Sequence, residues 1–225
     1  MFLSSGSPPR WISFDCYGTL IDWQSGIRCA FEDLIRVPRE EAAELTQTWE
    51  RIQWEKIQGP YVSYEKIMQD AFRETLEQFG HRYGGYALEA FVESLGRWEP
   101  FHDVNPALIR LSRRYKLAII SNSDRLLLGR SLRQLTVRFD ALITAEDVRV
   151  YKPNPEVFRY ALRRLACPAH EVAHVAFGAD YDLEPAHAIG FRAVYLNREK
   201  LPVPEVPLEA EISDLGELSS LWEED

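Results

Sequence analysis

The chain has 225 residues, of which 46% are hydrophobic and 27% are charged, and this composition is ordinary for a globular protein. The formal net charge is −9, and an acidic surface repels phosphate backbones and anionic lipid, so nucleic-acid and membrane roles are disfavoured. The cysteines number 3, without metal-ligand spacing, and the N-terminal residues lack the features of a signal peptide. A soluble cytoplasmic protein is therefore predicted.

Short apolar runs recur along the chain, and each is followed by a polar turn. They are WISF (11–14), KLAII (116–120), ALIT (141–144), VAHVAF (172–177), AVYL (193–196) and AEIS (210–213). Runs this short, beside helical patterns such as PEVFRYALRRLA, are typical of strands in a parallel, doubly wound α/β sheet. In such a sheet the functional site lies beyond the carboxyl ends of the strands.

Between the first and second predicted strands the pattern changes to helical spacing. Four helical segments are expected, at 26–35, 40–58, 63–80 and 87–98. A block of helices inserted after the first strand predicts a helical cap domain. The expected division is a core domain, 1–24 and 99–225, and a cap domain, 25–98.

Polar side chains follow several of the predicted strands. Asp15 ends the first strand, Gly18 permits a tight turn after it, and Thr19 brings a hydroxyl near the carboxylate. The other polar residues lie in SNSD, YKP and FGADYD; they are Ser121, Asn122, Lys152, Asp180 and Asp182. Because the carboxyl ends of parallel strands share one edge, these groups are expected to gather there.

In this order FDCYGTLID, SNSD, YKP and FGADYD resemble the four motifs of the haloacid dehalogenase (HAD) superfamily, and the resemblance spans nearly the whole chain. Within it, FDCYGTLIDW, SNSDR and YKPNP look most like the branch of 2-haloacid dehalogenases and L-azetidine-2-carboxylate hydrolase. The resemblance implies a Rossmann-like core with an inserted helical cap and a small-molecule substrate. A homodimer formed through the cap would fit the family.

The residue at position 17 helps to distinguish attack on carbon from attack on phosphorus. HAD phosphatases carry a second aspartate two residues after the first, which protonates the leaving oxygen, and that position here is Tyr17. A phenol with a pKa of about 10 is no base at neutral pH, whereas halide leaves without a proton. The first motif IV acid of the phosphatases falls on Phe177, so Mg²⁺ would lack oxygen ligands. We therefore expect attack on carbon without a metal or other cofactor.

By resemblance, Asp15 attacks the substrate carbon and forms an ester, which Asp182 helps a water molecule to hydrolyse. Lys152 would keep Asp15 ionised and stabilise developing charge. The residues implied to contact the substrate are Tyr17, Thr19, Ser121, Asn122 and Arg51.

Three positions depart from the dehalogenase pattern. Arg51 is the nearest candidate for the family's cap arginine beside the leaving halide, and its alternative is a solvated helix residue. Ala179 and Phe158 stand where the family carries asparagine and tyrosine. Opening of a strained ring, with a ring nitrogen as the leaving group, therefore stays an alternative to displacement of halide.

The leading hypothesis is a hydrolase that acts through an Asp15 ester on a small 2-substituted carboxylic acid. A Mg²⁺-dependent phosphatase is the first alternative, with Asp180 supplying a missing ligand, and a non-catalytic HAD-fold binding protein is the second. HEVAH, from His170 to His174, matches a zinc-protease pattern that needs both histidines on one helical face. Here the first is expected in a loop and the second in a strand, so zinc is disfavoured.

Overall fold

The computed structural model describes residues 7–222, which contain one six-stranded sheet with the order β3-β2-β1-β4-β5-β6. All of its strand pairs are parallel. The strands are β1 (Trp11–Phe14), β2 (Lys116–Ser121), β3 (Ala141–Thr144), β4 (Val172–Ala176), β5 (Arg192–Leu196) and β6 (Ala210–Ile212). All six predicted strands and the doubly wound α/β architecture are confirmed.

By its internal contacts the described chain divides into two compact units. The first, the sheet unit, holds the described residues up to Ile21, Pro100–Asn122 and the described residues from Leu135 onward. The second, the helical unit, holds Asp22–Glu99 and Ser123–Gln134. The predicted cap, 25–98, falls inside the helical unit, and its role as a cap domain stays a prediction.

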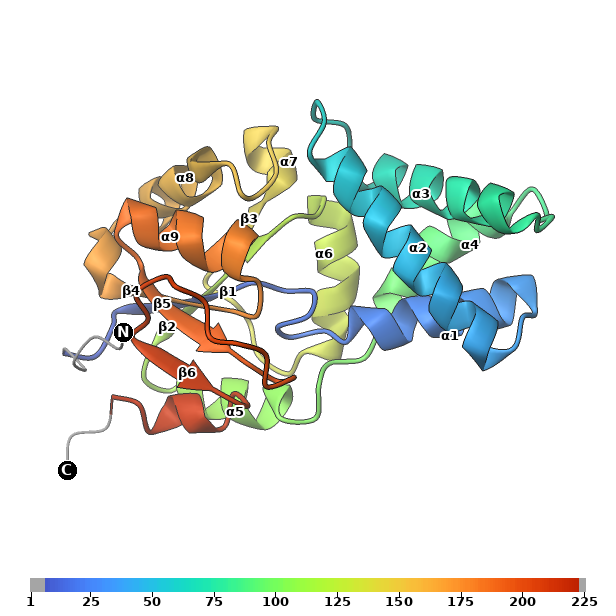
Figure 1. The fold of residues 1–225 in the computed structure, drawn as a ribbon. Coiled ribbons are helices and arrows are strands. Elements are labelled where there is room, and N and C mark those ends of the chain that lie inside the picture. Colours follow the sequence, from blue (N-terminus) through green and yellow to red (C-terminus); the bar gives the residue numbers. More distant parts are fainter. Residues whose placement is uncertain (1–6, 223–225) are drawn as a thin grey trace. The chain divides into compact units, whose positions relative to one another are not determined.

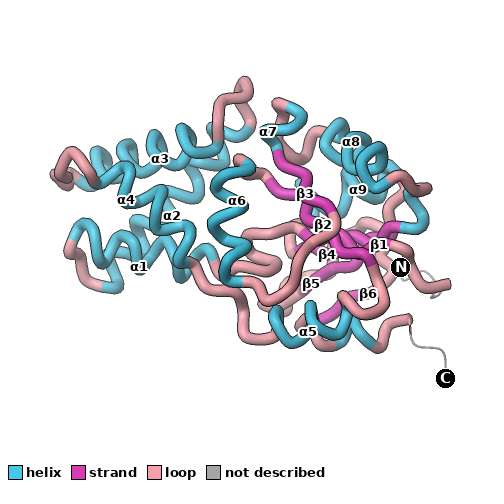
Figure 2. Tube along the Cα trace, turned by 180° about the vertical axis from the view of Figure 1, so that it is seen from behind, coloured by secondary structure: helices cyan, strands magenta, loops and turns pink. Residues whose placement is uncertain are grey.

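In the sheet unit, helices cover both faces of the sheet. The helices are α5 (Val104–Leu111), α7 (Ala145–Val148), α8 (Pro155–Leu165) and α9 (Glu184–Ile189). Figure 1 shows α8 and α9 on one face and α5 on the other, and Figure 2 shows the same layers from behind. The central strands are buried from end to end, which explains why they are continuous apolar runs without alternation.

Local signals position α8 against the sheet. The Asn154 side chain accepts a hydrogen bond from the Glu156 amide, and Pro155 opens the helix. Val157, Phe158, Ala161 and Leu165 then recur on one face and pack with sheet residues in a buried core. That packing fixes the loop just before α8, which carries Lys152.

The helical unit has its own aromatic core. Its helices are α1 (Trp23–Ile35), α2 (Arg39–Ile57), α3 (Tyr64–Phe79), α4 (Ala87–Ser94) and α6 (Arg125–Ser131), so the four helices expected between the first two strands are confirmed. The ring of Phe72 stacks on Phe91 at 4.2 Å and on Phe31 at 5.2 Å. None of the helices in residues 7–222 has the length and apolar character needed to span a bilayer.

Candidate active site

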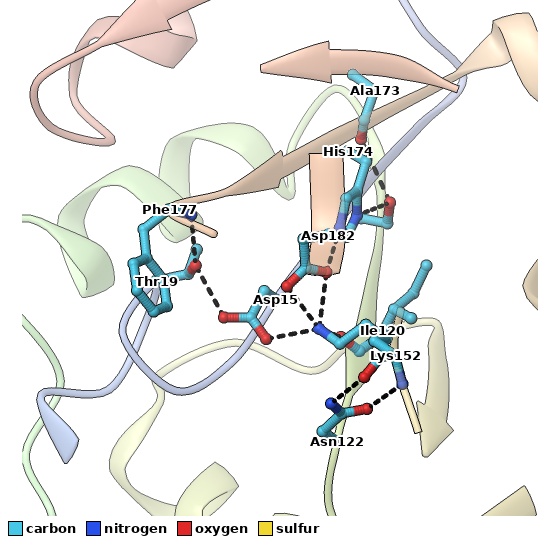
Figure 3. Close-up of polar contacts among 10 residues, drawn as sticks. Asp15, Thr19, Ile120, Asn122, Lys152, Ala173, His174, Phe177 and Asp182 are labelled. Atoms are coloured by element: carbon cyan, nitrogen blue, oxygen red, sulfur yellow. Dashed lines mark hydrogen bonds and ion pairs between the residues drawn. The ribbon is translucent and has the colours of Figure 1, made fainter. Parts of the chain in front are cut away.

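The candidate site lies at the carboxyl ends of β1, β2 and β4. Asp15 directly follows β1, and its amide donates to the Val175 carbonyl on β4 at 3.1 Å. Ser121 is the last residue of β2, and Asp182 lies in a turn of π-helix, Ala179–Leu183, that follows β4. The sheet unit thus brings Asp15, Thr19, Asn122, Lys152 and Asp182 together at this edge (Figure 3).

Lys152 lies at the centre of this cluster and is fully buried. Its Nζ donates to Oδ1 of Asp15 at 2.9 Å, to Oδ1 and Oδ2 of Asp182 at 2.7 and 2.8 Å, and to the Ile120 carbonyl at 3.1 Å. Burial by itself would lower the pKa of Lys152, but the charges of Asp15 and Asp182 raise it above its ordinary value. A permanent ammonium therefore links the two carboxylates.

The two carboxylates differ in acidity. Burial raises the pKa of Asp15 above its ordinary value, and the charge of Lys152 opposes that rise only in part. Asp182 is equally buried, but Lys152 and then a hydrogen bond from His174 hold its pKa below the ordinary value. Asp182 is thus the carboxylate that stays ionised most firmly, and Asp15 is the more basic one.

The turn after β1 orients the second oxygen of Asp15. Thr19 donates through Oγ1 to Oδ2 of Asp15 at 3.0 Å, and Oγ1 also accepts from the Phe177 amide at 3.3 Å. Gly18 has φ of 95°, and a Cβ there would lie 2.2 Å from Cε1 of Phe177. Glycine is needed at this position for both its conformation and its small size. Tyr17 lies half-buried in the same turn.

Ser121 and Asn122 have different surroundings. The Ser121 hydroxyl is buried and has no hydrogen-bond partner among the described residues. The Asn122 side chain instead binds the Lys152 backbone, where Oδ1 accepts from the amide at 2.7 Å and Nδ2 donates to the carbonyl at 3.1 Å. Asn122 thus holds the backbone that carries Lys152, and its predicted contact with the substrate stays a prediction.

The predicted Arg51 belongs to the helical unit. Its guanidinium donates to Glu55 at 2.7 Å and to Gln78 at 3.4 Å, and its side chain is 54% exposed. Arg51 is therefore not among the groups that the sheet unit brings together, and its role as a substrate contact stays a prediction. Asp180, the alternative acid of motif IV, is exposed, whereas Asp182 is buried.

His174 is a member of the cluster that the sequence did not predict. His170 lies in a short 3₁₀ turn, Ala169–Glu171, and His174 in β4, so the two histidines of HEVAH do not share a helical face. His174 is fully buried, and Nε2 lies 2.9 Å from Oδ1 of Asp182. A histidine in a strand otherwise made of Val and Ala was the available signal, because a buried polar group needs partners.

In this chain an aspartate at the end of the first strand of a parallel sheet is ion-paired with a buried lysine. This arrangement is that of the HAD hydrolases. The family described as haloacid dehalogenase-like hydrolase matches residues 9–190. The chain therefore belongs to this hydrolase family, and the resemblance found in the sequence is confirmed.

Several curated relatives are named as (S)-2-haloacid dehalogenases. The chain is 29% identical to (S)-2-haloacid dehalogenase 1 of Pseudomonas sp. (strain CBS-3), over 95% of this chain and 96% of that protein. It is 30% identical to (S)-2-haloacid dehalogenase of Pseudomonas putida, over 84% of each chain.

Among solved structures, L-2-haloacid dehalogenase from Xanthobacter autotrophicus with covalently bound chloropropionic acid is similar, with a TM-score of 0.81 and 25% identity. The similarity covers 95% of this chain and 98% of that one.

Proposed function

We propose that this hydrolase acts on a small 2-halocarboxylic acid through a covalent ester on Asp15, and releases halide and the 2-hydroxy acid. The observation that carries the proposal is the buried ammonium of Lys152, which donates to Asp15 at 2.9 Å and to Asp182 at 2.7 Å. Two of the curated relatives act, by their names, on (S)-2-haloacids, and one solved relative holds chloropropionic acid covalently.

The first step is displacement at carbon. A carboxylate oxygen of Asp15 attacks C2 of the substrate from the side opposite the halogen, and the carbon–halogen bond breaks as the halide leaves with the electron pair. No proton is needed, so no acid is required at the position of Tyr17. Lys152 and Thr19 each bind one oxygen of Asp15 and thereby fix the direction of attack.

The second step is hydrolysis of the ester. Water attacks the carbonyl carbon of the Asp15 ester, with its proton accepted by Asp182, and the bond from that carbon to the substrate oxygen breaks. The alkoxide takes up the proton held by Asp182 and leaves as the 2-hydroxy acid, while the new Asp15 carboxyl group loses its proton to solvent, so both carboxylates are restored. The ammonium of Lys152 is positioned to stabilise the negative oxygen of the tetrahedral intermediate.

Three features of the sheet unit favour this reaction over Mg²⁺-dependent phosphate chemistry. Tyr17 and Phe177 stand at two positions where the phosphatases carry acids. The ring of Phe177 packs directly on Gly18. No cluster of His, Cys, Asp and Glu suited to a metal ion occurs in the part of the chain that the structure describes. A hard cation would thus lack the oxygen ligands it prefers, and we propose a reaction that needs no metal.

The substrate carboxylate needs neutral or positive donors. The buried Ser121 hydroxyl lacks a partner, and such a group is expected to bind a ligand or water. We propose that Ser121 and the backbone of Asn122 bind the carboxylate, with Tyr17 and Thr19 on the neighbouring turn. Residues 25–98 would act as the cap and bring Arg51 to the leaving halide. A cytoplasmic location and a homodimer stay predictions.

The first test is release of chloride from L-2-chloropropionate in excess EDTA. We expect release by the wild type and by Asp180→Asn, the matched control at an exposed acid of the same turn as Asp182, and none by Asp15→Asn. A single turnover in ¹⁸O-water should put the label into Asp15 and leave the first product unlabelled. Label found directly in the first product would exclude the ester. Hydrolysis of p-nitrophenyl phosphate only with Mg²⁺ would instead support the phosphatase.

A further inference from the structure

The buried His174 is bonded at both ring nitrogens. Nε2 lies 2.9 Å from Oδ1 of Asp182 (Figure 3). Nδ1 lies 2.9 Å from Oγ of Ser13 on the neighbouring strand. Ser13 and His174 are partners in the register of β1 and β4, so the sheet itself aligns the two side chains. The ring also packs edge-on against Phe158 at 5.4 Å and Phe191 at 6.3 Å.

The direction of these hydrogen bonds follows from the chemistry of the partners. Asp182 has a lowered pKa and is ionised, so its oxygens can only accept. Nε2 of His174 therefore carries the hydrogen and donates to Oδ1. The hydroxyl of Ser13 can donate to Nδ1, an arrangement that favours the tautomer with its hydrogen on Nε2.

The two oxygens of Asp182 are bound unequally. Oδ1 accepts from both Lys152, at 2.7 Å, and His174, at 2.9 Å. Oδ2 accepts from Lys152 alone among the hydrogen bonds of the described site, at 2.8 Å. Two donors on one oxygen fix the rotation of the carboxylate, and the second oxygen retains capacity to accept a hydrogen bond from water.

Lys152 cannot hold the Asp182 carboxylate in place alone throughout the reaction. Its ammonium divides its donors among Asp15, Asp182 and the Ile120 carbonyl, so a turn toward a developing oxyanion weakens its hold on Asp182. The bond from His174 does not involve Asp15 and persists when Asp15 becomes an ester. His174 thus holds Asp182 at the step in which Lys152 is needed elsewhere.

We propose that His174, oriented by Ser13, is a positioning residue that holds Asp182 for hydrolysis of the Asp15 ester. This inference rests on the proposed function and adds to it a residue that acts on the second step only. The alternative is that His174 is a core histidine that contributes only to folding. Replacement of such a histidine would slow both steps equally, because it would act through the stability of the whole sheet unit.

The experiment compares His174→Leu, which fills the space without a donor, with His174→Gln, whose amide nitrogen can donate to Asp182. Rapid quenching after mixing with L-2-chloropropionate gives the first chloride release, and the intact mass gives the fraction of ester on Asp15. In His174→Leu we expect the first release to stay near the wild-type rate while steady turnover falls by about 10- to 100-fold, the effect of one lost hydrogen bond to a charge. Ester should accumulate. His174→Gln should recover a large part of the rate.

Controls separate the possible failures. His170→Leu removes an exposed histidine four positions away and should leave both rates unchanged. Equal slowing of both steps, with His174→Gln no better than His174→Leu, would overturn the positioning role and leave a structural histidine. If His174→Leu does not fold, Ser13→Ala is the fallback, because it keeps the imidazole and should still slow ester hydrolysis selectively. Equal slowing of both steps in Ser13→Ala would also overturn the positioning role of His174. Incorporation of ¹⁸O from water directly into the first product, with no ester found in any variant, would instead refute the proposed function.

Discussion

Replacement of Lys152 by methionine removes a buried charge and retains most of the side-chain volume. In the wild type Nζ of Lys152 contacts Asp15, Asp182 and the Ile120 carbonyl, all within 3.1 Å, and no part of the side chain is exposed. Breaking a buried ion pair by removing one partner costs about 3–5 kcal/mol. We expect a loss of that size in the unfolding free energy at neutral pH, together with loss of chloride release.

The loss should depend on pH in a defined direction. In the wild type Lys152 lowers the pKa of Asp182, so this carboxylate adds stability above its unfolded-state pKa and loses it as the pH falls. Without the ammonium, burial raises the pKa of Asp15 and Asp182 above their unfolded values, and each then destabilises the fold once ionised. The difference between wild type and variant should therefore be largest near pH 7 and shrink as the pH falls toward about 4.

Urea unfolding of both proteins at about pH 7 and about pH 4.5 measures this difference. Leu126→Met, at an exposed apolar position, is the control for a surface methionine. A loss below about 1 kcal/mol, or a loss that is the same at both pH values, would refute the argument that two buried carboxylates depend on this one cation.

Two further predictions follow from the same turn. Burial raises the pKa of Asp15, and attack on the substrate needs the ionised carboxylate. The kcat/KM for chloride release should therefore fall as the pH is lowered, with a midpoint above about 3.9, the ordinary pKa of aspartate. A midpoint at or below that value contradicts the assignment of Asp15 as the nucleophile. Gly18→Ala should lose about 1–3 kcal/mol of unfolding free energy, since alanine is strained at a φ of 95° and its Cβ meets Phe177. Adding Phe177→Ala should relieve the clash with the new Cβ but not the backbone strain at position 18. Full recovery of the unfolding free energy in the double variant would show that the backbone conformation contributes nothing to the loss.

Much of the fold could be predicted because its signals are local. The central strands β1 and β4 are buried on both faces, so each reads as a short apolar run, and the helices between the strands repeat their apolar residues with helical spacing. The gathering of Asp15, Lys152 and Asp182 follows from the topology, since parallel strands bring their carboxyl ends to one edge.

The remainder depends on side-chain directions and strand neighbours. The contact of His174 with Ser13 requires that β4 pair with β1 in a particular register, and strand order is not encoded in hydrophobic periodicity. An asparagine at the end of a strand is a typical ligand-binding residue. Here, however, the Asn122 side chain makes its hydrogen bonds to the backbone of Lys152, 30 residues away in sequence. Asp124 similarly accepts hydrogen bonds from the amides of Tyr64 and Glu65 at the start of α3.

The shared ammonium of Lys152 gives the proposed cycle an alternating charge. With Asp15 and Asp182 ionised, these three residues together carry one net negative charge, and esterification of Asp15 brings them to neutrality. Hydrolysis restores the negative charge while the 2-hydroxy acid anion still lies beside it. The repulsion between the two weakens the binding of the product anion once the ester is hydrolysed, and the same repulsion acts on the incoming substrate anion, so a bound anion is held best while Asp15 is esterified.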